Sequence, residues 1–310
     1  FSSDGHINFN KIFIRELLKE EVMIDFVFKK GYNEKIKLPK INVIETIPDF
    51  IFNNKKSIFA NKLCEIKKMN YINKVVNLSN YDLIILSSYD TVALYLSSIK
   101  KKLFLINHNN LQGLNNRIKL FFFKKISMTH AHIVFENYMK IYLKSIGVKN
   151  VFKISHGLPS KINPTFKINY LEKLKRNNFK KSIFIPSSSS SDFDFVQKII
   201  LDEEFNNFLN SNDILLIIKG NYELNNSTNI LVLKKYLTTD EYNYFFITSD
   251  IILIPYKNSF KNRVSAILHE CVSNNKPFIC SDIESFRVYE SLINYKPYFK
   301  SINDLKIRIS

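Results

Sequence analysis

A basic loop followed by a helix start gives residues 248–282 the clearest potential for chemistry. Lys261 and Arg263 lie in the loop, and Ser265 is a residue type that caps helix N-termini. The N–H groups and the positive dipole end at a helix start attract anions. Together with the two cations, the amides of Ser265 and Ala266 suit a ligand that carries phosphate. Plain N-capping and a solvated basic loop are the alternatives for these residues.

Glu270 stands about one turn further along the same predicted helix. A carboxylate accepts hydrogen bonds from paired hydroxyl groups. The alternative is an ordinary glutamate on a helix surface. The apolar runs 250–255 and 277–280 flank the loop and helix, and they predict two buried parallel strands. Because ligands bind beyond the carboxyl ends of such strands, the stretch predicts a site for a ligand that carries phosphate and hydroxyl groups.

Elsewhere the chain alternates short apolar runs with amphipathic segments, the pattern of parallel α/β folds. We expect two doubly wound Rossmann-like domains that face a cleft, with a boundary near residue 160. The expected strands are 22–28, 41–47, 81–87, 103–107, 131–135, 151–154, 182–185, 214–219, 230–233, 250–255, 277–280 and 297–299, and the expected helices are 11–19, 57–70, 90–98, 115–127, 137–146, 193–201, 204–209, 240–247 and 283–293.

Composition narrows the classes of protein that the chain can belong to. Its 310 residues are 45% hydrophobic, which allows a sizeable core. The three cysteines have no metal or disulfide spacing, so we expect a reduced protein without a metal site. No apolar run reaches the roughly 18 residues of a membrane span.

The net charge of +17 is uneven along the chain. Residues 1–160 hold 25 Lys and Arg against 12 Asp and Glu, a balance of +13, while residues 161–310 hold 20 against 16, a balance of +4. A basic first half favours an anionic partner, and a solvated lysine-rich surface is the alternative. No nucleic-acid-binding motif appears, so we expect no nucleic-acid partner.

A basic and aromatic helix is predicted at 115–127, within this basic half. Its cations are Arg117, Lys119, Lys124 and Lys125, and they alternate with three phenylalanines at 121–123. Such a helix suits the interface of an anionic membrane. Ordinary core packing of the phenylalanines is the alternative.

Taken in order, the motifs resemble GT-B glycosyltransferases of the family 4-like group (glycosyl transferases group 1). SDIILIPY, then S-A-x-x-x-E and KPFICSD, resemble that family's strand, its E-x7-E helix and the strand that follows. VFENYMKIYLKSIGVKNVFKISHGLP resembles the end of its N-terminal domain. DGHIN resembles its first glycine loop, and LINHNN resembles its strand that ends in histidine. The ordered set spans nearly the whole chain.

The resemblance implies roles for individual residues. Glu270 would bind the donor ribose, and Gly5 would let the backbone approach the donor phosphates. His108 would be the catalytic residue near the reacting sugar and the acceptor. Asn262 occupies the place of the family's first glutamate, which contacts the donor sugar, and this departure leaves retention or inversion of the anomeric configuration open. For Gly5 and His108 the alternatives are a tight turn and a structural histidine at a strand end.

Two further donor-binding roles concern the charge of the diphosphate and the stacking of the nucleotide base. The family's Arg and Lys after the first C-terminal-domain strand are replaced by PSSSSSDFD, in which serines occupy 187–191. We therefore expect Lys219 or Arg263 to balance the diphosphate charge. Tyr236 follows the strand at 230–233 and is expected to stack on the nucleotide base, with core packing as its alternative.

The resemblance also implies a function. Residues 1–160 would be an acceptor-binding domain that lacks its first strand, and 161–310 a nucleotide-sugar-binding domain truncated at its C-terminal end. The enzyme would be of the hexosyltransferase type, retaining, and independent of metals and other cofactors. It would move a sugar from a nucleotide-sugar to a lipid-linked or surface-polysaccharide acceptor, as in lipopolysaccharide or capsule biosynthesis. We expect a cytoplasmic protein held peripherally on the inner face of the cell membrane.

Four alternatives to this function stay open. Two keep the GT-B fold with different chemistry, namely a polyol-phosphate transferase and a sugar-nucleotide epimerase. The others are a non-catalytic GT-B-like protein and a basic nucleic-acid-binding protein.

Overall fold

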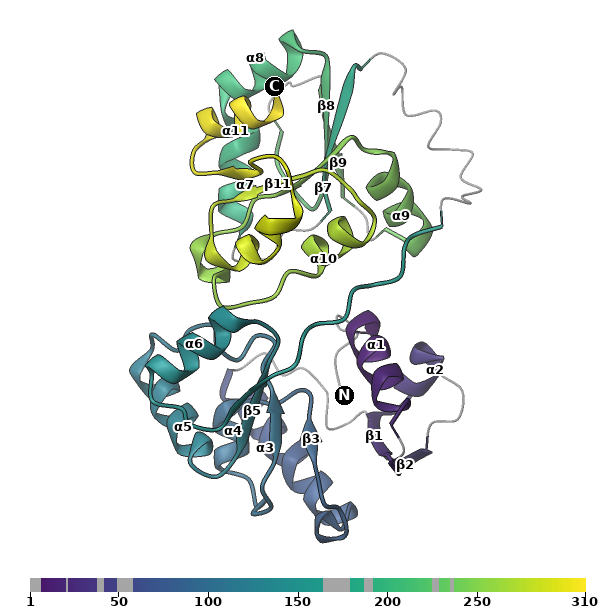
Figure 1. Cartoon of the computed structure of the whole chain (residues 1–310), viewed down its shortest axis with the longest axis vertical. Helices are drawn as coiled ribbons and strands as arrows, with labels where there is room; N and C mark the ends of the chain where they lie inside the picture. Colours follow the sequence, from purple (N-terminus) through teal and green to yellow (C-terminus); the bar gives the residue numbers. More distant parts are fainter. Residues whose placement is uncertain are drawn as a thin grey trace. The chain divides into compact units, whose positions relative to one another are not determined.

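Every strand pair among the described residues is parallel, as the alternation of strands and helices predicts. The computed structural model shows an α/β chain with two compact units (Figure 1). Unit 1 comprises Phe1–Pro159 with Asn262–Val264, and unit 2 comprises Ser160–Lys261 with Ser265–Ser310. The structure describes residues 7–20, 22–37, 42–48, 58–163, 179–186, 192–224, 229–234 and 237–310.

Unit 2 is built on a six-stranded parallel sheet in the order β9-β8-β7-β10-β11-β12. This is the strand order of Rossmann nucleotide-binding domains, in which the chain reverses direction across the sheet. In chain order its elements are β7 (Lys181–Ile185), α7 (Phe193–Leu201), α8 (Glu203–Ser211), β8 (Ile214–Lys219), β9 (Ile230–Leu233), α9 (Thr239–Thr248), β10 (Ile251–Ile254), η5 (Asn258–Phe260), α10 (Ala266–Ser273), β11 (Phe278–Ser281), η6 (Glu284–Leu292), β12 (Tyr298–Phe299) and α11 (Ile302–Ile309).

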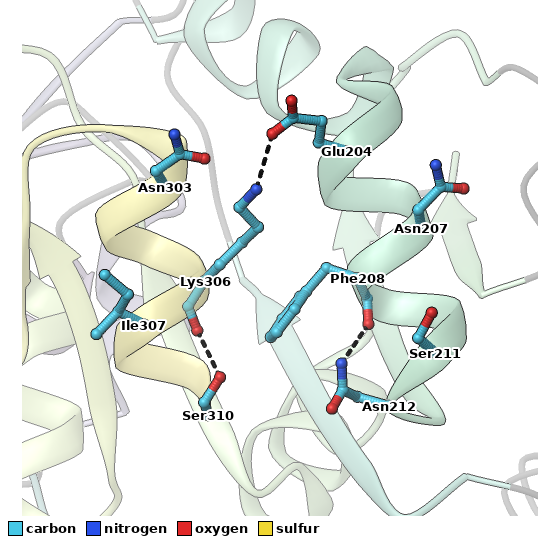
Figure 2. Close-up of a pocket in the computed structure, with 9 residues that line it drawn as sticks. All are labelled: Glu204, Asn207, Phe208, Ser211, Asn212, Asn303, Lys306, Ile307 and Ser310. Atoms are coloured by element: carbon cyan, nitrogen blue, oxygen red, sulfur yellow. Dashed lines mark hydrogen bonds and ion pairs between the residues drawn. The ribbon is translucent and has the colours of Figure 1, made fainter.

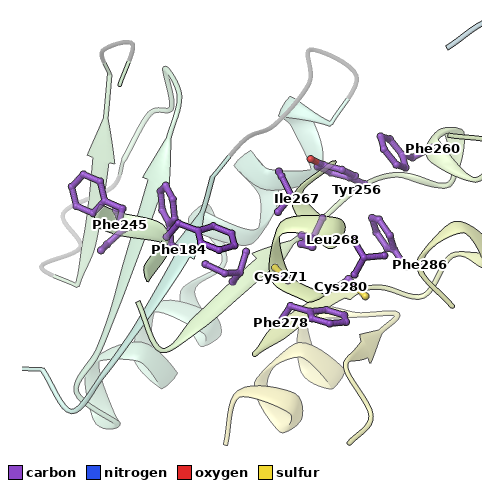
Figure 3. Packing of buried hydrophobic residues seen from close by; sticks show 14 of the residues in the cluster. Phe184, Phe245, Tyr256, Phe260, Ile267, Leu268, Cys271, Phe278, Cys280 and Phe286 are labelled. Atoms are coloured by element: carbon purple, nitrogen blue, oxygen red, sulfur yellow. The ribbon is translucent and has the colours of Figure 1, made fainter. Parts of the chain in front are cut away.

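Both faces of this sheet are apolar because successive strand residues point to opposite faces. Along β7, Phe184 enters one cluster while Ile183 and Ile185 enter the other. α9, α10 and η6 contribute to the first cluster, which Figure 3 shows, and α7, α8 and α11 contribute to the second. Burying one large apolar side chain stabilises the fold by about 2 kcal/mol, so neither face can be left open to water.

Unit 1 contains two parallel sheets among its described residues. β1 and β2 form a pair, and the other four strands have the order β3-β4-β5-β6. In chain order its elements are α1 (Ile7–Leu17), β1 (Asp25–Lys29), α2 (Tyr32–Ile36), β2 (Asn42–Ile47), α3 (Ile58–Val75), η3 (Leu78–Asn80), β3 (Ile85–Leu86), α4 (Thr91–Tyr95), β4 (Phe104–Ile106), α5 (Arg117–Ser127), β5 (Ala131–Val134), α6 (Asn137–Ser145) and β6 (Val151–Lys153).

Most expected elements are present, and several differ in kind or length. α1 begins at Ile7 instead of residue 11, and α4 has 5 residues where the span 90–98 was expected. The strand expected at 81–87 is only the two-residue β3, because two residues are all that pair with β4 in this edge strand. The helix expected at 283–293 is the 3₁₀ helix η6. Phe286 is fully buried there, while Arg287 donates to Asp282 Oδ1 at 2.7 Å. The backbone leaves helical values at Tyr289 (φ −108°, ψ 17°), which divides the segment into short turns in place of one regular α-helix.

A capping box starts α9, the helix that delivers a site residue described below. Thr238 Oγ1 accepts from the N–H of Glu241 at 3.2 Å, and Glu241 Oε2 accepts from the N–H of Thr238 at 2.8 Å. Two N–H groups at the helix start are thereby satisfied reciprocally.

Replacing this cap should loosen the first turn of α9. We expect Thr238→Ala to cost about 1 kcal/mol, which corresponds to roughly fivefold faster native-state hydrogen exchange of the first-turn amides. Thr239→Ala is the matched control, since Thr239 is exposed and takes no part in the capping box. Equal exchange rates in the two variants would show that the cap does not stabilise the helix.

Candidate functional site

The switch point of the unit 2 sheet lies between β7 and β10. Ile251 pairs with Ile183 and Ile252 with Phe184. The chain continues from β7 to β8 on one side, and from β10 to β11 on the other. Loops that leave neighbouring strands in opposite directions diverge, and open α/β sheets bind their ligands at such points. The carboxyl ends of β7 and β10, the loop after β10 and the start of α10 are therefore the candidate site.

Asp192, at the start of α7, is bonded to the loop after β10. It follows the serine run and is 1% exposed, and its Oδ1 accepts from the N–H of Lys257 at 3.0 Å. Lys257 Nζ also lies 3.5 Å from Asp194 Oδ2. A buried carboxylate that accepts a backbone hydrogen bond fixes the loop after β10 relative to β7.

Ser265 caps α10 as predicted. Its Oγ accepts from the N–H of Leu268 at 3.2 Å, and the residue is buried. Ala266 is the first helical residue and is exposed. The cap uses the third N–H of the helix, so the N–H groups of Ala266 and Ile267 have no acceptor within the helix and suit an anion. The start of α10 therefore fits both interpretations of Ser265, an N-cap and part of an anion site.

Glu270 lies one turn beyond Ala266 and is half-buried. Its Oε2 accepts a 2.5 Å hydrogen bond from Tyr242 Oη, which α9 supplies. Burial raises the pKa of the Glu270 carboxyl, and the hydrogen bond from Tyr242 partly lowers it again. Burial likewise raises the pKa of the Tyr242 phenol well above its usual value, with Glu270 adding to the effect, so the phenol stays the donor. The Glu270 carboxylate is held in one orientation on the side of the helix that starts the candidate site.

Lys219 ends β8, next to β7 in the sheet. Its side chain is half-buried, and burial lowers the pKa of its ammonium group. Gly220 follows with a φ of 155°, and a Cβ there would lie 2.4 Å from the ring of Tyr222. This glycine is therefore required where the strand ends, which fixes Lys219 at the carboxyl edge.

Arg263 and Asn262 belong to unit 1 by their contacts. The Arg263 carbonyl accepts from Tyr138 Oη at 2.7 Å, and Arg263 Nη1 donates to Gln112 Oε1 at 3.4 Å. Asn262 is half-buried. The predicted donor-binding role of Arg263 and the sugar-binding role of Asn262 stay predictions.

His108 lies just past the end of β4 in unit 1, half-buried, with its ring centroid 5.1 Å from that of Phe135. The preceding residue, Asn107, is fully buried and donates to the carbonyls of Leu105 and Ile133 at 3.0 and 3.1 Å. It also accepts from Tyr89 Oη at 2.9 Å. These bonds fix the strand end that carries His108.

His132 completes this buried network, and its tautomer follows from its partners. Ser127 Oγ donates to the Phe123 carbonyl at 2.6 Å, so it accepts from His132 Nε2–H at 2.8 Å. His132 Nδ1 then accepts from Asn107 Nδ2 at 3.2 Å, in a hydrogen bond that shares one of the two amide hydrogens with a carbonyl. Burial, and to a smaller extent His130, lowers the pKa of His132 to about 3. The ring is a neutral structural member of the network.

Some predicted site residues lie outside the described part of the chain. These are Gly5, Tyr236 and the serines at 187–191. Conversely, Tyr242 and Asp192 were not predicted. Neither belongs to a local motif, and each acts through a partner more than 25 residues away in sequence.

A pocket of about 660 Å³ lies in unit 2 between α8 and α11 (Figure 2). Lys306 and Glu204 form an ion pair across it at 3.0 Å. Ser211 and Asn212 lead directly into β8, which places the pocket at the amino-terminal edge of that strand. The candidate site is at the opposite, carboxyl edge, so the pocket is not part of it.

The residues that the structure describes contain no group of three or more His, Cys, Asp or Glu side chains arranged to hold a metal ion. No helix within these ranges is both long and apolar enough to cross a membrane.

Sequence comparison finds no matching protein family and no matching curated protein. Solved structures do match. The chain is similar to a UDP-GlcNAc 2-epimerase from Methanocaldococcus jannaschii, at 12% identity and a TM-score of 0.59, over 99% of this chain and 90% of that one. It is also similar to Anabaena HepE in complex with UDP-glucose, at 12% identity and a TM-score of 0.57, over 98% of this chain and 83% of that one. The fold is GT-B.

A third similar structure is the α,α-trehalose-6-phosphate synthase of Burkholderia multivorans, at 10% identity and a TM-score of 0.54, over 84% of this chain and 70% of that one. Identities this low show the fold alone. The predicted class of two Rossmann-like domains is confirmed, while membership of the family 4-like group stays a prediction.

Because the pKa of Glu270 is raised, we expect this residue to make the stability of the protein depend on pH. The folded carboxyl holds its proton more tightly than the unfolded one, which titrates near 4.5. The contribution of this group to the free energy of unfolding is therefore complete at low pH and is lost as pH rises through the folded pKa. Glu270→Gln stays neutral and can still accept from Tyr242. We expect its stability relative to the wild type to rise with pH over this window and then level off.

Urea unfolding of the wild type and of Glu270→Gln between about pH 4 and about pH 8 measures the difference in their free energies of unfolding. In a Tyr242→Phe background the plateau should move to higher pH, because the bond that lowers the pKa of Glu270 is gone. Glu203→Gln, an exposed position in α8, serves as the control. A pH-independent difference for Glu270→Gln would contradict the assignment.

Proposed function

We propose that the protein is a nucleotide-sugar-dependent glycosyltransferase. One observation carries the proposal: Glu270, held by Tyr242, lies one turn inside the Ser265-capped helix at the switch point of a Rossmann sheet. A carboxylate suits the two hydroxyls of a ribose, and the helix start suits the diphosphate attached to it. The similarity to a structure described as a complex with UDP-glucose supports a uridine nucleotide as the first donor to test.

The leaving diphosphate needs positive charge in the transition state. The α10 N-terminus and Lys219 would supply it from unit 2, so we propose a metal-independent reaction without a cofactor. Burial lowers the pKa of Lys219, and the approach of a diphosphate would raise it again, which favours the charged ammonium in the complex. Arg263 is the second proposed cation.

The finer features of the reaction belong to the same proposal. The enzyme would be of the hexosyltransferase type and would retain the anomeric configuration. Its acceptor would be a lipid-linked or surface-polysaccharide sugar, and it would work on the inner face of the cell membrane. His108, at the end of β4, would hydrogen-bond a sugar hydroxyl or take the acceptor proton.

A sugar-nucleotide epimerase is the second candidate. It is favoured by the similarity to the UDP-GlcNAc 2-epimerase, which extends over 99% of the chain. The two reactions differ in their products. An epimerase changes one stereocentre of its sugar with no acceptor present, whereas a transferase consumes the donor and releases nucleotide when an acceptor is added.

A thermal-shift panel of UDP-, GDP-, ADP- and CMP-sugars, followed by calorimetric titration, tests the proposal. We expect one nucleotide class to bind. Glu270→Ala should weaken that binding by about tenfold or more, the value of a hydrogen bond to a charged group. The double variant Lys219→Ala, Arg263→Ala should also bind more weakly, since the diphosphate loses both proposed cations.

Glu203→Ala is the matched control, an exposed glutamate of α8 outside the site, and it should bind as the wild type does. Stabilisation by none of the four classes would overturn the proposal. Wild-type affinity in the double variant would overturn only the roles of Lys219 and Arg263.

A further inference from the structure

One side of α5 presents apolar side chains to solvent. Ile118, Phe121 and Met128 are 69%, 52% and 75% exposed. With Lys125 they recur every three or four residues, which puts them in one stripe along the helix. Lys125 Nζ lies 5.5 Å from the centre of the Phe121 ring. Side chains of this size are normally buried, so a continuous exposed stripe marks an interaction surface.

The end of α4 extends this stripe. Tyr95 and Leu96 are 43% and 53% exposed. The ring of Tyr95 lies 5.2 Å from that of Phe122, which in turn lies 5.4 Å from that of Phe121. The two helices lie side by side (Figure 1). We call Tyr95, Leu96, Ile118, Phe121 and Met128 the α4–α5 face.

The helix divides its three phenylalanines between two roles. Phe123 is fully buried in the core of unit 1, and Phe122 is half-buried. Phe121 alone of the three is exposed. In the run at 121–123, Phe123 therefore packs in the core, whereas Phe121 is available to an interface.

Positive charge surrounds the α4–α5 face. Residues 91–135 hold seven Lys and Arg and no Asp or Glu. Arg117, Lys124 and Lys125 are exposed on α5 itself. The lysines at 100–102 precede Leu103, whose N–H donates to His130 Nδ1 at 3.3 Å, so they lie near the C-terminal end of α5.

The acid that precedes this run is already engaged. Asp90 Oδ1 accepts from the N–H groups of Val92 and Ala93 at 3.1 and 2.9 Å, and the carboxylate is paired with Lys62. Lys119, in contrast, is half-buried and donates to the Gln112 carbonyl, so it does not add to the exposed charge. Within residues 91–135 the exposed charge is therefore of one sign.

We propose that the α4–α5 face docks on an anionic membrane surface. Apolar side chains would enter the boundary between headgroups and acyl chains, while the flanking lysines and Arg117 contact lipid phosphates. A nucleic acid would match the cations but not the exposed aliphatic residues Leu96, Ile118 and Met128. A second copy of the chain would bring cations against cations. The acid-free charge and the apolar stripe together fit an anionic bilayer better than either.

Vesicle sedimentation tests the proposal on the full chain without any donor, so its result is independent of nucleotide binding. We expect binding to phosphatidylglycerol–phosphatidylcholine vesicles that weakens with salt, and little binding to phosphatidylcholine alone. Ile118→Ser, Phe121→Ser, Met128→Ser should lower partitioning by about tenfold or more. Lys124→Gln, Lys125→Gln should lower it by a similar factor and reduce the salt dependence.

The control replaces two equally exposed residues of unit 2, Leu292→Ser with Ile307→Ser, both 69% exposed, and should bind as the wild type does. Unchanged binding of the triple α5 variant would overturn the proposal. So would binding to random DNA but not to vesicles, or a dimer that dissociates in the triple variant. Circular dichroism and nucleotide titration of each variant show whether a loss of binding comes from unfolding.

Discussion

The constraint that organises unit 2 is that its parallel sheet is apolar on both faces. Crossovers between parallel strands are right-handed, so a chain that moves in one direction across a sheet can cover only one face with helices. To cover the other face it must return and proceed in the opposite direction. β7 to β9 take the first course, and β10 to β12 take the second. The switch point is thus a by-product of burying two clusters of side chains.

The candidate site uses what this reversal provides. α9 carries the chain back across the sheet and α10 follows β10, and both pack on the same face. The Tyr242–Glu270 hydrogen bond joins the two helices. A carboxyl group that a ligand would use is thereby positioned by the same packing that stabilises the core. The orientation of this carboxyl group therefore comes from the packing of the fold.

Local sequence was sufficient for several features that depend on neighbours within a few residues. The parallel strands, the Ser265 cap and the position of Glu270 one turn further all follow from short-range pattern and were predicted. Features that depend on long-range pairing were not. Tyr242 meets Glu270 only through the register of two helices, and Asp192 meets Lys257 across 65 residues. Periodicity predicts which elements exist, but it does not say which side chains of different elements meet.

The buried network below His108 has a consequence for how the protein responds to acid. Since burial lowers the pKa of His132 to about 3, its ring is neutral from mildly acidic to neutral pH. The chain of groups from Tyr89 through Asn107 to Ser127 therefore keeps the same protons and the same polarity throughout that range. The charge of this strand end therefore does not change over that range. The ionisation of a neighbouring group can be observed there by itself.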